Sequence, residues 1–526
     1  MIKGISRRSF TAMGGAAALG AAALPVVASA QAAGLDYATQ TYGMPSFMVP
    51  PEPIAQADIV SVLDYDVVIV GAGTTGLAAA VAAHNAGVKA CVVQKQAIAV
   101  AQGGGGSGVD LANSDPAALA YLVDIHVAAN HYRPIRSVVQ NWADWSGEAW
   151  NAVIDYTADL ANPLAIQQTK ERQYGDTALK VSTFKAGPTG SDFAGAVPQY
   201  FDKLAEDGVD VYYETPAVQL VQASDGAVTG VVCESDEGYK QFNASMGVIL
   251  CAGDYQNDAE MVDYLLPDMS NCDRKQSGKT GDGIKMGVWA GGVIEPVGHS
   301  KMSHGYGNGP MSGEPLLIVD SNGERFCCEG IDLSLMQNYL RFNKPSGMWF
   351  QIFDSNYEEY VNGWGGSAPE ADSLDSMNPE SESYSGRGFV YRADTLEELA
   401  AKLDIPADAF VATVERYNEL CAEGADADFG KFPQYLKPVD TAPFYGISRN
   451  TGITAILSGL LTDGCQRVVD ADGAPIKGLY AAGNNAGGFF GAIDYPFTGE
   501  YIDGISIGRC ISGGYSAVMS AIEDAR

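Results

Sequence analysis

The chain has 526 residues, a length that predicts about two or three packed units rather than one small domain. Hydrophobic residues make up 46% of it and aromatic residues 10%, which excludes an intrinsically disordered chain. The net charge of −32 excludes a nucleic-acid binder that neutralises phosphates, and it disfavours any membrane contact beyond a peripheral one. The 62 glycines are clustered, which favours close approach of the backbone to a ligand.

Residues 1–30 have the pattern of an export signal. Basic residues precede an apolar run from Met13 to Val27, and Ala28-Ser29-Ala30 follows as a small-residue cleavage site. Ser6-Arg7-Arg8-Ser9-Phe10 matches the twin-arginine signal, by which folded bacterial proteins cross the cytoplasmic membrane. An uncleaved anchor helix is the alternative, and the weak hydrophobicity of the run disfavours it. We therefore expect an exported protein, with residues 31–60 as a flexible linker.

A dinucleotide-binding unit is predicted directly after this linker. Asp64–Val70 is rich in β-branched residues and predicts a buried parallel strand. An Ala-rich helix is expected over Leu77–Asn85 with Gly87 as its cap, and a second strand over Lys89–Gln94. The glycine-rich turn between strand and helix has the G-x-G-x-x-G spacing that brings a pyrophosphate to a helix N-terminus. The turn residues expected to contact the dinucleotide are Gly71, Ala72, Gly73 and Gly76.

Two further positions bear on the cofactor. Gln94 ends the second strand, where an acidic residue usually binds the ribose hydroxyls, and its amide is expected to bond a hydroxyl without the charge. A second glycine-rich segment begins at Gln102, Gly103 and Gly104. It is either a flexible loop or a surface against a flavin, where side chains would clash, and its place after a dinucleotide fold favours the flavin.

The nine cysteines and five histidines indicate no metal centre. No Cys-x-x-Cys pair occurs, so the spacing reveals no haem or iron–sulfur site. The histidines are too dispersed for a zinc site with closely spaced ligands. For Cys327 and Cys328, two thiols are favoured over a strained disulfide between neighbours.

Four ordered motifs carry a resemblance to a known family. They are Val248–Tyr255, Thr280–Gly283, Thr395–Asn418 and Gly478–Gly483. Over roughly residues 64–515 the chain resembles the flavoproteins of the fumarate reductase, succinate dehydrogenase and 3-ketosteroid dehydrogenase family. The resemblance implies FAD as the cofactor. It also implies FAD contacts beyond those above, at Val218, Gly253, Asp282, Gly483, Asn484, Tyr501 and Ile502, with Asn484 standing where most members have glutamate.

The same resemblance implies the fold class and the domain boundaries. The fold is an α/β, doubly wound FAD-binding domain of the glutathione-reductase-like Rossmann type, interrupted by an α+β cap domain. The FAD-binding domain is expected over residues 61–296 and 442–526, and the substrate cap domain over 297–441. Substrate is expected between the two.

The substrate pocket lacks the groups with which fumarate reductases of this family hold two carboxylates. The proton-donating arginine corresponds to Leu333, and a carboxylate-binding histidine corresponds to Thr454. The last arginine has no counterpart in the segment Phe490–Gly499. Only His299 remains at a place that resembles a substrate-binding histidine. A dicarboxylate would leave charge unpaired in a closed pocket, so fumarate is disfavoured as substrate.

Tyr495-Pro496-x-x-Gly499 resembles a motif of the ketosteroid dehydrogenases, in which the tyrosine hydroxyl and the glycine amide bind a ketone oxygen. Two neutral donors so placed form an oxyanion hole, although a structural Tyr-Pro turn is the alternative. The catalytic tyrosine of those enzymes corresponds to Leu333, so steroid dehydrogenation is in doubt. The identity of the proton donor is not decided by the sequence. Tyr339 and Arg341 are candidates, and His304 and Tyr306 are further ones.

These features favour an exported FAD-dependent reductase of a carbon–carbon double bond conjugated to a carbonyl in a small organic acceptor. Reduced FAD would supply hydride from N5, and Tyr495 with Gly499 would polarise the carbonyl. Because no haem module is evident, electrons are expected from a separate cytochrome or a quinol-linked membrane protein, as in anaerobic respiration. The alternatives are a dehydrogenase of hydrophobic ketones of the 3-ketosteroid type and a non-catalytic flavin electron carrier.

Overall fold

The structure is a computed structural model. It describes residues 44–110, 113–186, 193–270, 272–302, 310–330, 348–385, 389–450, 452–491 and 504–526. The chain divides into a segment that ends at Ser46 and one compact unit, Phe47–Arg526. Within the described ranges, no helix has the length and apolar character that crossing a membrane requires.

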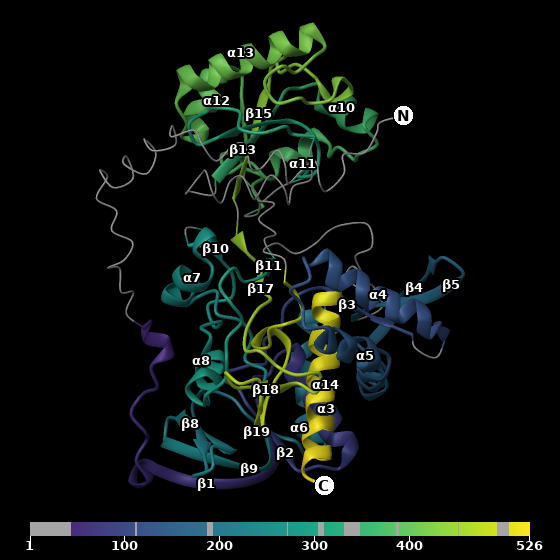
Figure 1. Cartoon of the computed structure of the whole chain (residues 1–526). Helices are drawn as coiled ribbons and strands as arrows, with labels where there is room; N and C mark the ends of the chain where they lie inside the picture. The colour runs from purple at the N-terminus through teal and green to yellow at the C-terminus, as the bar shows by residue number, and fades with distance from the viewer. Residues whose placement is uncertain are drawn as a thin grey trace, which may run out of the picture. The chain divides into compact units, whose positions relative to one another are not determined.

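The centre of the compact unit is a mixed β-sheet of eight strands among the described residues (Figure 1). Its main path runs β18-β19-β9-β1-β2-β6, and β8 joins β9 to β7. The pairs β1–β2, β1–β9, β2–β6 and β9–β19 are parallel, as the doubly wound fold requires. The strands are β1 (Ile59–Val70), β2 (Ala90–Val93), β6 (Asp210–Tyr212), β7 (Ala217–Gln222), β8 (Val228–Ser235), β9 (Gly238–Leu250), β18 (Arg467–Val469) and β19 (Pro475–Ala481).

The predicted strand, turn and helix at the start of the sheet are confirmed. β1 is buried from Val67 to Val70, because apolar β-branched side chains there face helices on both sides of the sheet. Helix α3 (Thr74–Ala86) follows, and it ends at Gly87, whose φ of 68° gives the left-handed cap. β1 itself begins at Ile59, several residues earlier than the pattern indicated.

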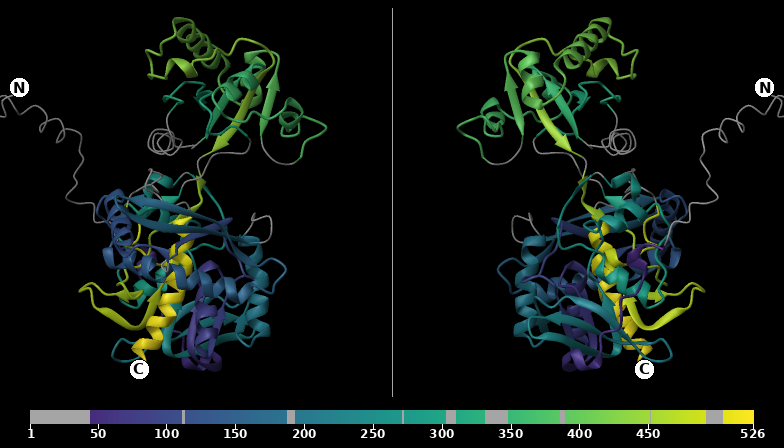
Figure 2. Two further views of the ribbon diagram at one scale, coloured as in Figure 1. Left: turned by 90° about the vertical axis from the view of Figure 1, so that its right-hand side faces the viewer. Right: turned by 90° about the vertical axis from the view of Figure 1, so that its left-hand side faces the viewer.

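Helices α14 (Ile505–Asp524) and α3, which lie far apart in the sequence, pack against each other. Helix α14 runs beside α3 in all views (Figures 1 and 2). The two backbones approach closely, since a Cβ at Gly514 would lie 2.2 Å from the carbonyl oxygen of Thr75. Alanines of α3 fill the space between them and are almost completely buried. Helix α5 (Arg136–Thr157) packs on the same core through Trp150.

Smaller elements surround this core. Helices in the same unit are α4 (Pro116–Ala129), α6 (Phe193–Glu206), α7 (Ala259–Leu265) and α8 (Asp282–Trp289). The short 3-10 turns are η1 (Ser46–Met48), η2 (Gln56–Asp58), η4 (Pro267–Met269), η5 (Pro433–Tyr435) and η6 (Gly483–Asn485). The small sheets pair β3 (Gly105–Val109), β5 (Thr177–Ala186) and β4 (Leu164–Tyr174), then β10 (Asp273–Arg274) with β16 (Gly452–Ile453), and β11 (Lys301–Met302) with β17 (Ala455–Ile456).

A second sheet has a hydrophobic core of its own. Its antiparallel strands follow the order β12-β13-β15-β14, and α12 and α13 cover one face (Figure 1). β15, the strand of this sheet that comes latest in the chain, runs from Phe444 to Asn450. The elements are β12 (Leu317–Asp320), β13 (Met348–Phe353), β14 (Val390–Ala393), β15 (Phe444–Asn450), α10 (Tyr357–Gly363), α11 (Ala371–Asp375), α12 (Leu396–Leu403) and α13 (Ala407–Glu423).

A buried network of charges lies beside this second core. The Arg325 guanidinium donates to Glu329 at 2.8 Å and to Asp426 at 2.9 Å, and all three side chains are at most 5% exposed. Lys431 completes the network, 3.5 Å from Glu329 and 2.8 Å from the Tyr417 hydroxyl. Because the two carboxylates face two cations, no net charge is buried, which is the condition for burying such groups at all.

Candidate active site

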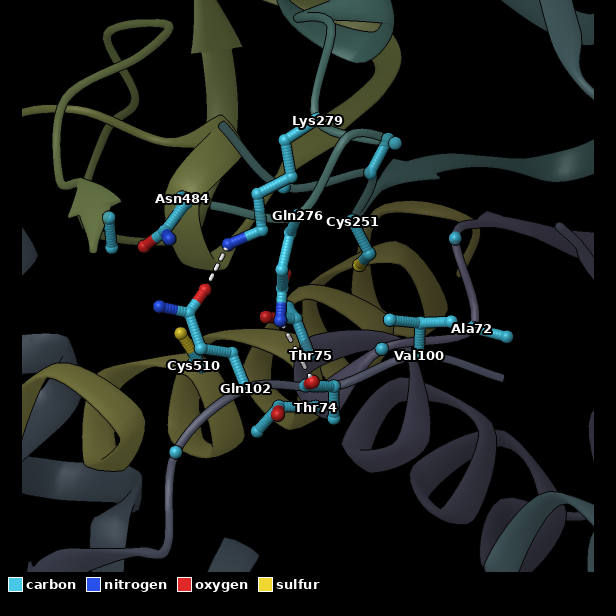
Figure 3. Close-up of a pocket in the computed structure, with 18 of the residues that line it drawn as sticks. Ala72, Thr74, Thr75, Val100, Gln102, Cys251, Gln276, Lys279, Asn484 and Cys510 are labelled. Atoms are coloured by element: carbon cyan, nitrogen blue, oxygen red, sulfur yellow. Dashed lines mark hydrogen bonds between the residues drawn. The ribbon is translucent and has the colours of Figure 1, made fainter. Parts of the chain in front are cut away.

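A cavity of about 640 Å³ opens at the carboxyl ends of β1, β2 and β9 (Figure 3). The starts of α3 and α14 form part of its wall, as do the segments around Gln102 and Lys279. This is the edge of a doubly wound sheet at which ligands bind, and the volume suits a large organic cofactor. The nine cysteines are all free thiols, and Cys251 and Cys510 line the cavity. Among the described residues, no cluster of His, Cys, Asp and Glu is arranged to hold a metal ion.

The glycine-rich turn forms one side of the cavity. Gly71 has φ of 112°, and a Cβ there would lie 2.6 Å from the carbonyl oxygen of Cys251. Gly73 precedes α3, and no side chain caps the helix there. The amide groups of the first helical turn, at Thr74 and Thr75, therefore keep their capacity to bind an anion in the cavity. This is a site for a pyrophosphate.

Gln94 lines the cavity at the end of β2, but the protein engages its amide. Its Oε1 accepts from the Ala72 amide at 3.1 Å, and its Nε2 donates to the Ile98 carbonyl at 3.1 Å and to Gln96 at 3.3 Å. The side chain thus holds the glycine-rich turn in place through the Ala72 amide. We expected this amide to bond a ribose hydroxyl. Both of its N–H groups already have acceptors in the protein, so neither is free to donate to the ribose.

Next to Gln94, Lys95 reaches across to the Thr-Gly-Asp-Gly motif. Its ammonium lies 2.8 Å from the Asp282 carboxylate and 2.7 Å from the Thr280 hydroxyl. Asp282, assigned to the cofactor by the motif, lines the cavity at the start of α8. The pair joins the second strand to that helix and gives this end of the cavity one charge of each sign.

A polar cluster forms the other end of the cavity, and three of its members, Lys279, Gln102 and Asn484, are labelled in Figure 3. The Lys279 ammonium donates to Gln102 Oε1 and lies 3.1 Å from the Asp254 carboxylate. Gln102 also donates to the backbone oxygen of Thr454. Asn484 donates to Asp254 at 3.3 Å. Asp254 is fully buried, whereas Lys279, Gln102 and Asn484 all line the cavity.

Behind this cluster, Arg509 of α14 supports the segment after β19. It donates to Asn484 Oδ1 at 2.9 Å and to the carbonyl oxygens of Ala486 and Leu457 at 3.2 and 3.3 Å. Its guanidinium lies 5.2 Å from the centre of the Phe490 ring. Arg509 is 5% exposed, so these contacts replace the solvation of its charge.

The structure brings most of the predicted cofactor residues to one cavity. Those that line it are Gly71, Ala72, Gly73, Gln94, Gln102, Gly103, Gly253, Asp282 and Asn484. Four others lie behind the lining: Gly76 and Gly483 pack at the start of α3, the Gly104 carbonyl accepts from the Phe193 amide, and Val218 lies in β7 next to the lining residue Ala217. Tyr339, Arg341, Tyr495, Gly499, Tyr501 and Ile502 lie outside the described residues.

His299 does not line the cavity. Its Nε2 lies 2.7 Å from the Glu295 carbonyl, which can only accept, so Nε2 carries the proton and Nδ1 accepts from the Tyr255 hydroxyl at 2.6 Å. The ring is fully buried, and burial lowers the pKa of His299 to about 4. The structure therefore gives this neutral histidine hydrogen bonds within the core, to Tyr255 and to the Glu295 carbonyl.

Several lining residues went unrecognised in the sequence. Lys95, Gln276 and Lys279 project into the cavity from positions between motifs, and Gln276 donates to the Ala101 carbonyl at 3.1 Å. Lys279 directly precedes the Thr-Gly-Asp-Gly motif, and that proximity was the available signal. Its partner Asp254 is 25 residues earlier in the chain, so no spacing rule joins the two.

Comparison with known proteins agrees with this geometry. The family model described as FAD binding domain matches residues 66–494. A vinyl phenol reductase of Lactiplantibacillus plantarum is 28% identical over 463 residues, which cover 81% of this chain and 91% of that protein. A 4-oxocyclohexanecarboxylate 2-dehydrogenase of Sinomonas cyclohexanicum is 27% identical over 375 residues, covering 60% and 61% of the two chains.

The fold comparison points the same way. The open conformation of a flavocytochrome c3 fumarate reductase superposes with a TM-score of 0.65 at 23% identity, covering 89% of this chain and 79% of that one. The predicted fold class and the resemblance to this flavoprotein group are thereby confirmed. FAD is the cofactor, and the residues fit it: the glycine-rich turn and the uncapped start of α3 suit the pyrophosphate, and the cavity extends to both sides of that turn.

Proposed function

The chain belongs to the FAD binding domain family, and from this premise we propose that it is a reductase of a carbon–carbon double bond conjugated to a carbonyl. The substrate would be a small organic acceptor, an enone or enoate. Extensive similarity to a vinyl phenol reductase, over most of both chains, supports reduction of a carbon–carbon double bond, and the segment Tyr495-Pro496-x-x-Gly499 supports a carbonyl next to it. Bound FAD supplies the hydride chemistry.

The lining of the cavity supports a substrate that is not a dianion. Thr454, at the position of a carboxylate-binding histidine, lines the cavity and offers its backbone oxygen to Gln102 and Gln256. No arginine or histidine occurs among the described residues that line the cavity. A second carboxylate would therefore lack a charged, bidentate partner there. This absence, together with Leu333 and Thr454 at the positions of the family's arginine and histidine, supports selectivity for a neutral or singly charged acceptor.

In this proposal Tyr495 and Gly499 hold the carbonyl oxygen. The tyrosine hydroxyl and the glycine amide are two neutral donors, and they stabilise the charge that develops on the oxygen as the double bond is reduced. A proton is then needed at the α-carbon. Tyr339 and Arg341 are the proposed donors. Electrons would arrive from a separate protein, a cytochrome or a quinol-linked partner.

A substrate panel tests the proposal directly. Holoprotein is reduced with methyl viologen, and kcat/KM is measured for cyclohexenone, an aryl-acrylate, 4-vinylphenol and fumarate. The enone or the aryl-acrylate should be preferred over fumarate by at least tenfold. A preference for fumarate would refute the proposed selectivity for a neutral or singly charged acceptor. Inactivity with all four compounds would favour a non-catalytic flavin electron carrier.

The Tyr495→Phe variant tests the residue assignment. Removal of one oxyanion donor is expected to lower kcat about 10²–10³-fold while FAD stays bound. The matched control is Tyr132→Phe, because Tyr132 is 78% exposed and lies outside the cavity lining. An unchanged rate in Tyr495→Phe would remove this residue from the mechanism.

A dehydrogenase that acts in the opposite direction is the second candidate, and similarity to a dehydrogenase of a cyclic ketone favours it. The two directions are separated by comparing viologen-driven reduction of the enone with oxidation of the saturated ketone by an artificial dye. A higher kcat/KM in the second assay would assign the dehydrogenase.

We further propose that the protein is exported by the twin-arginine route. The support is the segment Ser6–Phe10, which lies outside the described residues. In a bacterial host, replacement of both Arg7 and Arg8 by lysine should retain the protein in the cytoplasm. Unchanged recovery outside the cytoplasmic membrane would contradict export by this route.

A further inference from the structure

We propose that Lys279, fixed in place by Asp254, is the positive charge that raises the reduction potential of the bound FAD. The proposal concerns the cofactor and does not depend on which substrate the protein reduces. Its basis is the position of one ammonium group inside the cavity and the way in which the protein holds it.

The first step is to distinguish the two ends of the cavity. The pyrophosphate belongs at the glycine-rich turn and the start of α3, which line the cavity. The adenosine half lies toward the end of β2, at Gln94, as in other dinucleotide folds of this type. The other end, formed by Gln102 and Asn484, is left for the flavin half. Lys279 reaches this second end, since its ammonium contacts Gln102 (Figure 3).

The second step is that the Lys279 side chain is held with its ammonium at the cavity wall. Its carboxylate partner Asp254 is fully buried and saturated with donors. Asp254 Oδ1 accepts from the amide and the side-chain Nε2 of Gln256, each at 3.1 Å. Its Oδ2 accepts from Lys279 and Asn484 at 3.1 and 3.3 Å. With both oxygens held, the carboxylate is a fixed anchor, and it keeps the ammonium at the cavity wall.

The third step is electrostatic. Two-electron reduction adds negative charge to the flavin, and that charge is only partly cancelled by proton uptake. A cation at the cavity wall therefore binds the reduced form more tightly than the oxidised form, because charges interact more strongly where solvent is excluded. By linkage, this difference in affinity appears as a higher reduction potential of the bound cofactor. The more distant carboxylate of Asp254 acts in the opposite sense.

The experiment measures the two-electron midpoint potential of the holoprotein by anaerobic equilibration with a reference dye. Lys279→Gln should shift the equilibrium toward oxidised FAD by at least tenfold, which is about 30 mV for a two-electron couple. Asp254→Asn removes the opposing charge but keeps an oxygen that accepts from Lys279, so it should shift the equilibrium the other way. Opposite signs are what a charge effect requires, whereas loss of a structural contact would move both variants in the same direction.

Two controls complete the design. Lys279→Arg keeps the charge and should stay within threefold of the parent equilibrium. Lys285→Gln removes a lysine from a comparable pair, 2.6 Å from Asp258 and outside the cavity lining, and should also leave the potential in place.

The proposal is overturned if Lys279→Gln moves the equilibrium by less than tenfold or toward reduced FAD. It is equally overturned if Lys285→Gln matches its shift. Should Lys279→Gln fail to retain FAD, Lys279→Met decides. A shift toward oxidised FAD of at least tenfold in that variant supports the role of Lys279, and a smaller or opposite shift refutes it.

Discussion

Asn484 accepts a 2.9 Å hydrogen bond from Arg509 through its side-chain oxygen, at a position where related flavoproteins carry glutamate. The other end of the same amide donates to Asp254 at 3.3 Å. A glutamate could bind the arginine, but it would meet Asp254 with a second negative charge. An amide satisfies a cation on one side and an anion on the other, so Asn484 and the buried Asp254 belong together.

Asn484→Asp tests this relationship. The variant keeps the acceptor for Arg509 but places two carboxylates side by side, so the free energy of unfolding should fall by about 1–3 kcal/mol. Urea denaturation of the holoprotein measures the loss. Adding Asp254→Asn should restore part of it, and a double-mutant cycle that gives simple additivity would show that the two side chains do not interact.

Gly71→Ala should abolish FAD binding. A Cβ at this position would lie 2.6 Å from a backbone oxygen, and the φ of 112° is one that alanine rarely adopts. The ratio of flavin absorbance to protein absorbance after purification measures the effect. Gly87→Ala is the matched control, because Gly87 is also left-handed but has open space around it. It should cost about 1–2 kcal/mol of stability and retain the flavin.

Stability should fall between pH 6.5 and about 4 because of two buried histidines. Burial lowers the pKa of His126 and of His299 to about 4 from the ordinary 6.5. In this window the unfolded chain binds protons that the folded chain does not, so acid favours unfolding, and the contribution is complete above pH 6.5. Urea unfolding at a series of pH values measures the slope.

The histidine variants isolate that slope from other titrating groups. His126→Gln and His299→Gln should each unfold at a lower urea concentration than the parent. Between pH 7 and pH 5, however, their free energy of unfolding should change less than that of the parent. A slope as steep as that of the parent in both variants would assign the acid sensitivity to other groups.

Arg325→Met should destabilise the second core by about 3–5 kcal/mol. The substitution leaves Glu329 and Asp426 buried without their main cation, which is far costlier than loss of an exposed pair. Arg416→Met is the control, since Arg416 is 45% exposed in its pairs with Asp428 and Glu419 and should cost no more than about 1 kcal/mol. Equal losses in the two variants would mean that burial of the network has no energetic consequence.

The parts of the fold that follow local patterns could be predicted from the sequence. The β-branched run to Val70, the glycine-rich turn and the alanine-rich helix specify one another over some 25 residues, and the structure has all three. The use of Gln94 could not be predicted in this way. Whether its amide faces a ribose or the turn depends on Ile98 and Gln96, whose positions are set by the following loop.

Pairs of residues far apart in the chain could not be predicted from the sequence either. Lys279 meets Asp254, and Arg509 meets Asn484, only after strands, helices and loops have been packed. His299 stands at a place that resembles a substrate-binding histidine, and its hydrogen bonds to Tyr255 and to the Glu295 carbonyl form only in the folded core. Charge and polarity at such sites are decided by tertiary neighbours, not by spacing along the chain.

The close contact between α3 and α14 has a consequence for the timing of cofactor uptake. The nucleotide-binding helix α3 (Thr74–Ala86) is synthesised long before α14 (Ile505–Asp524), the helix that covers it. Until residues around Gly514 emerge, the alanine-rich surface of α3 has no cover and one wall of the cavity is missing. FAD can therefore be captured only after the residues up to the end of α14 have been made and have packed against α3.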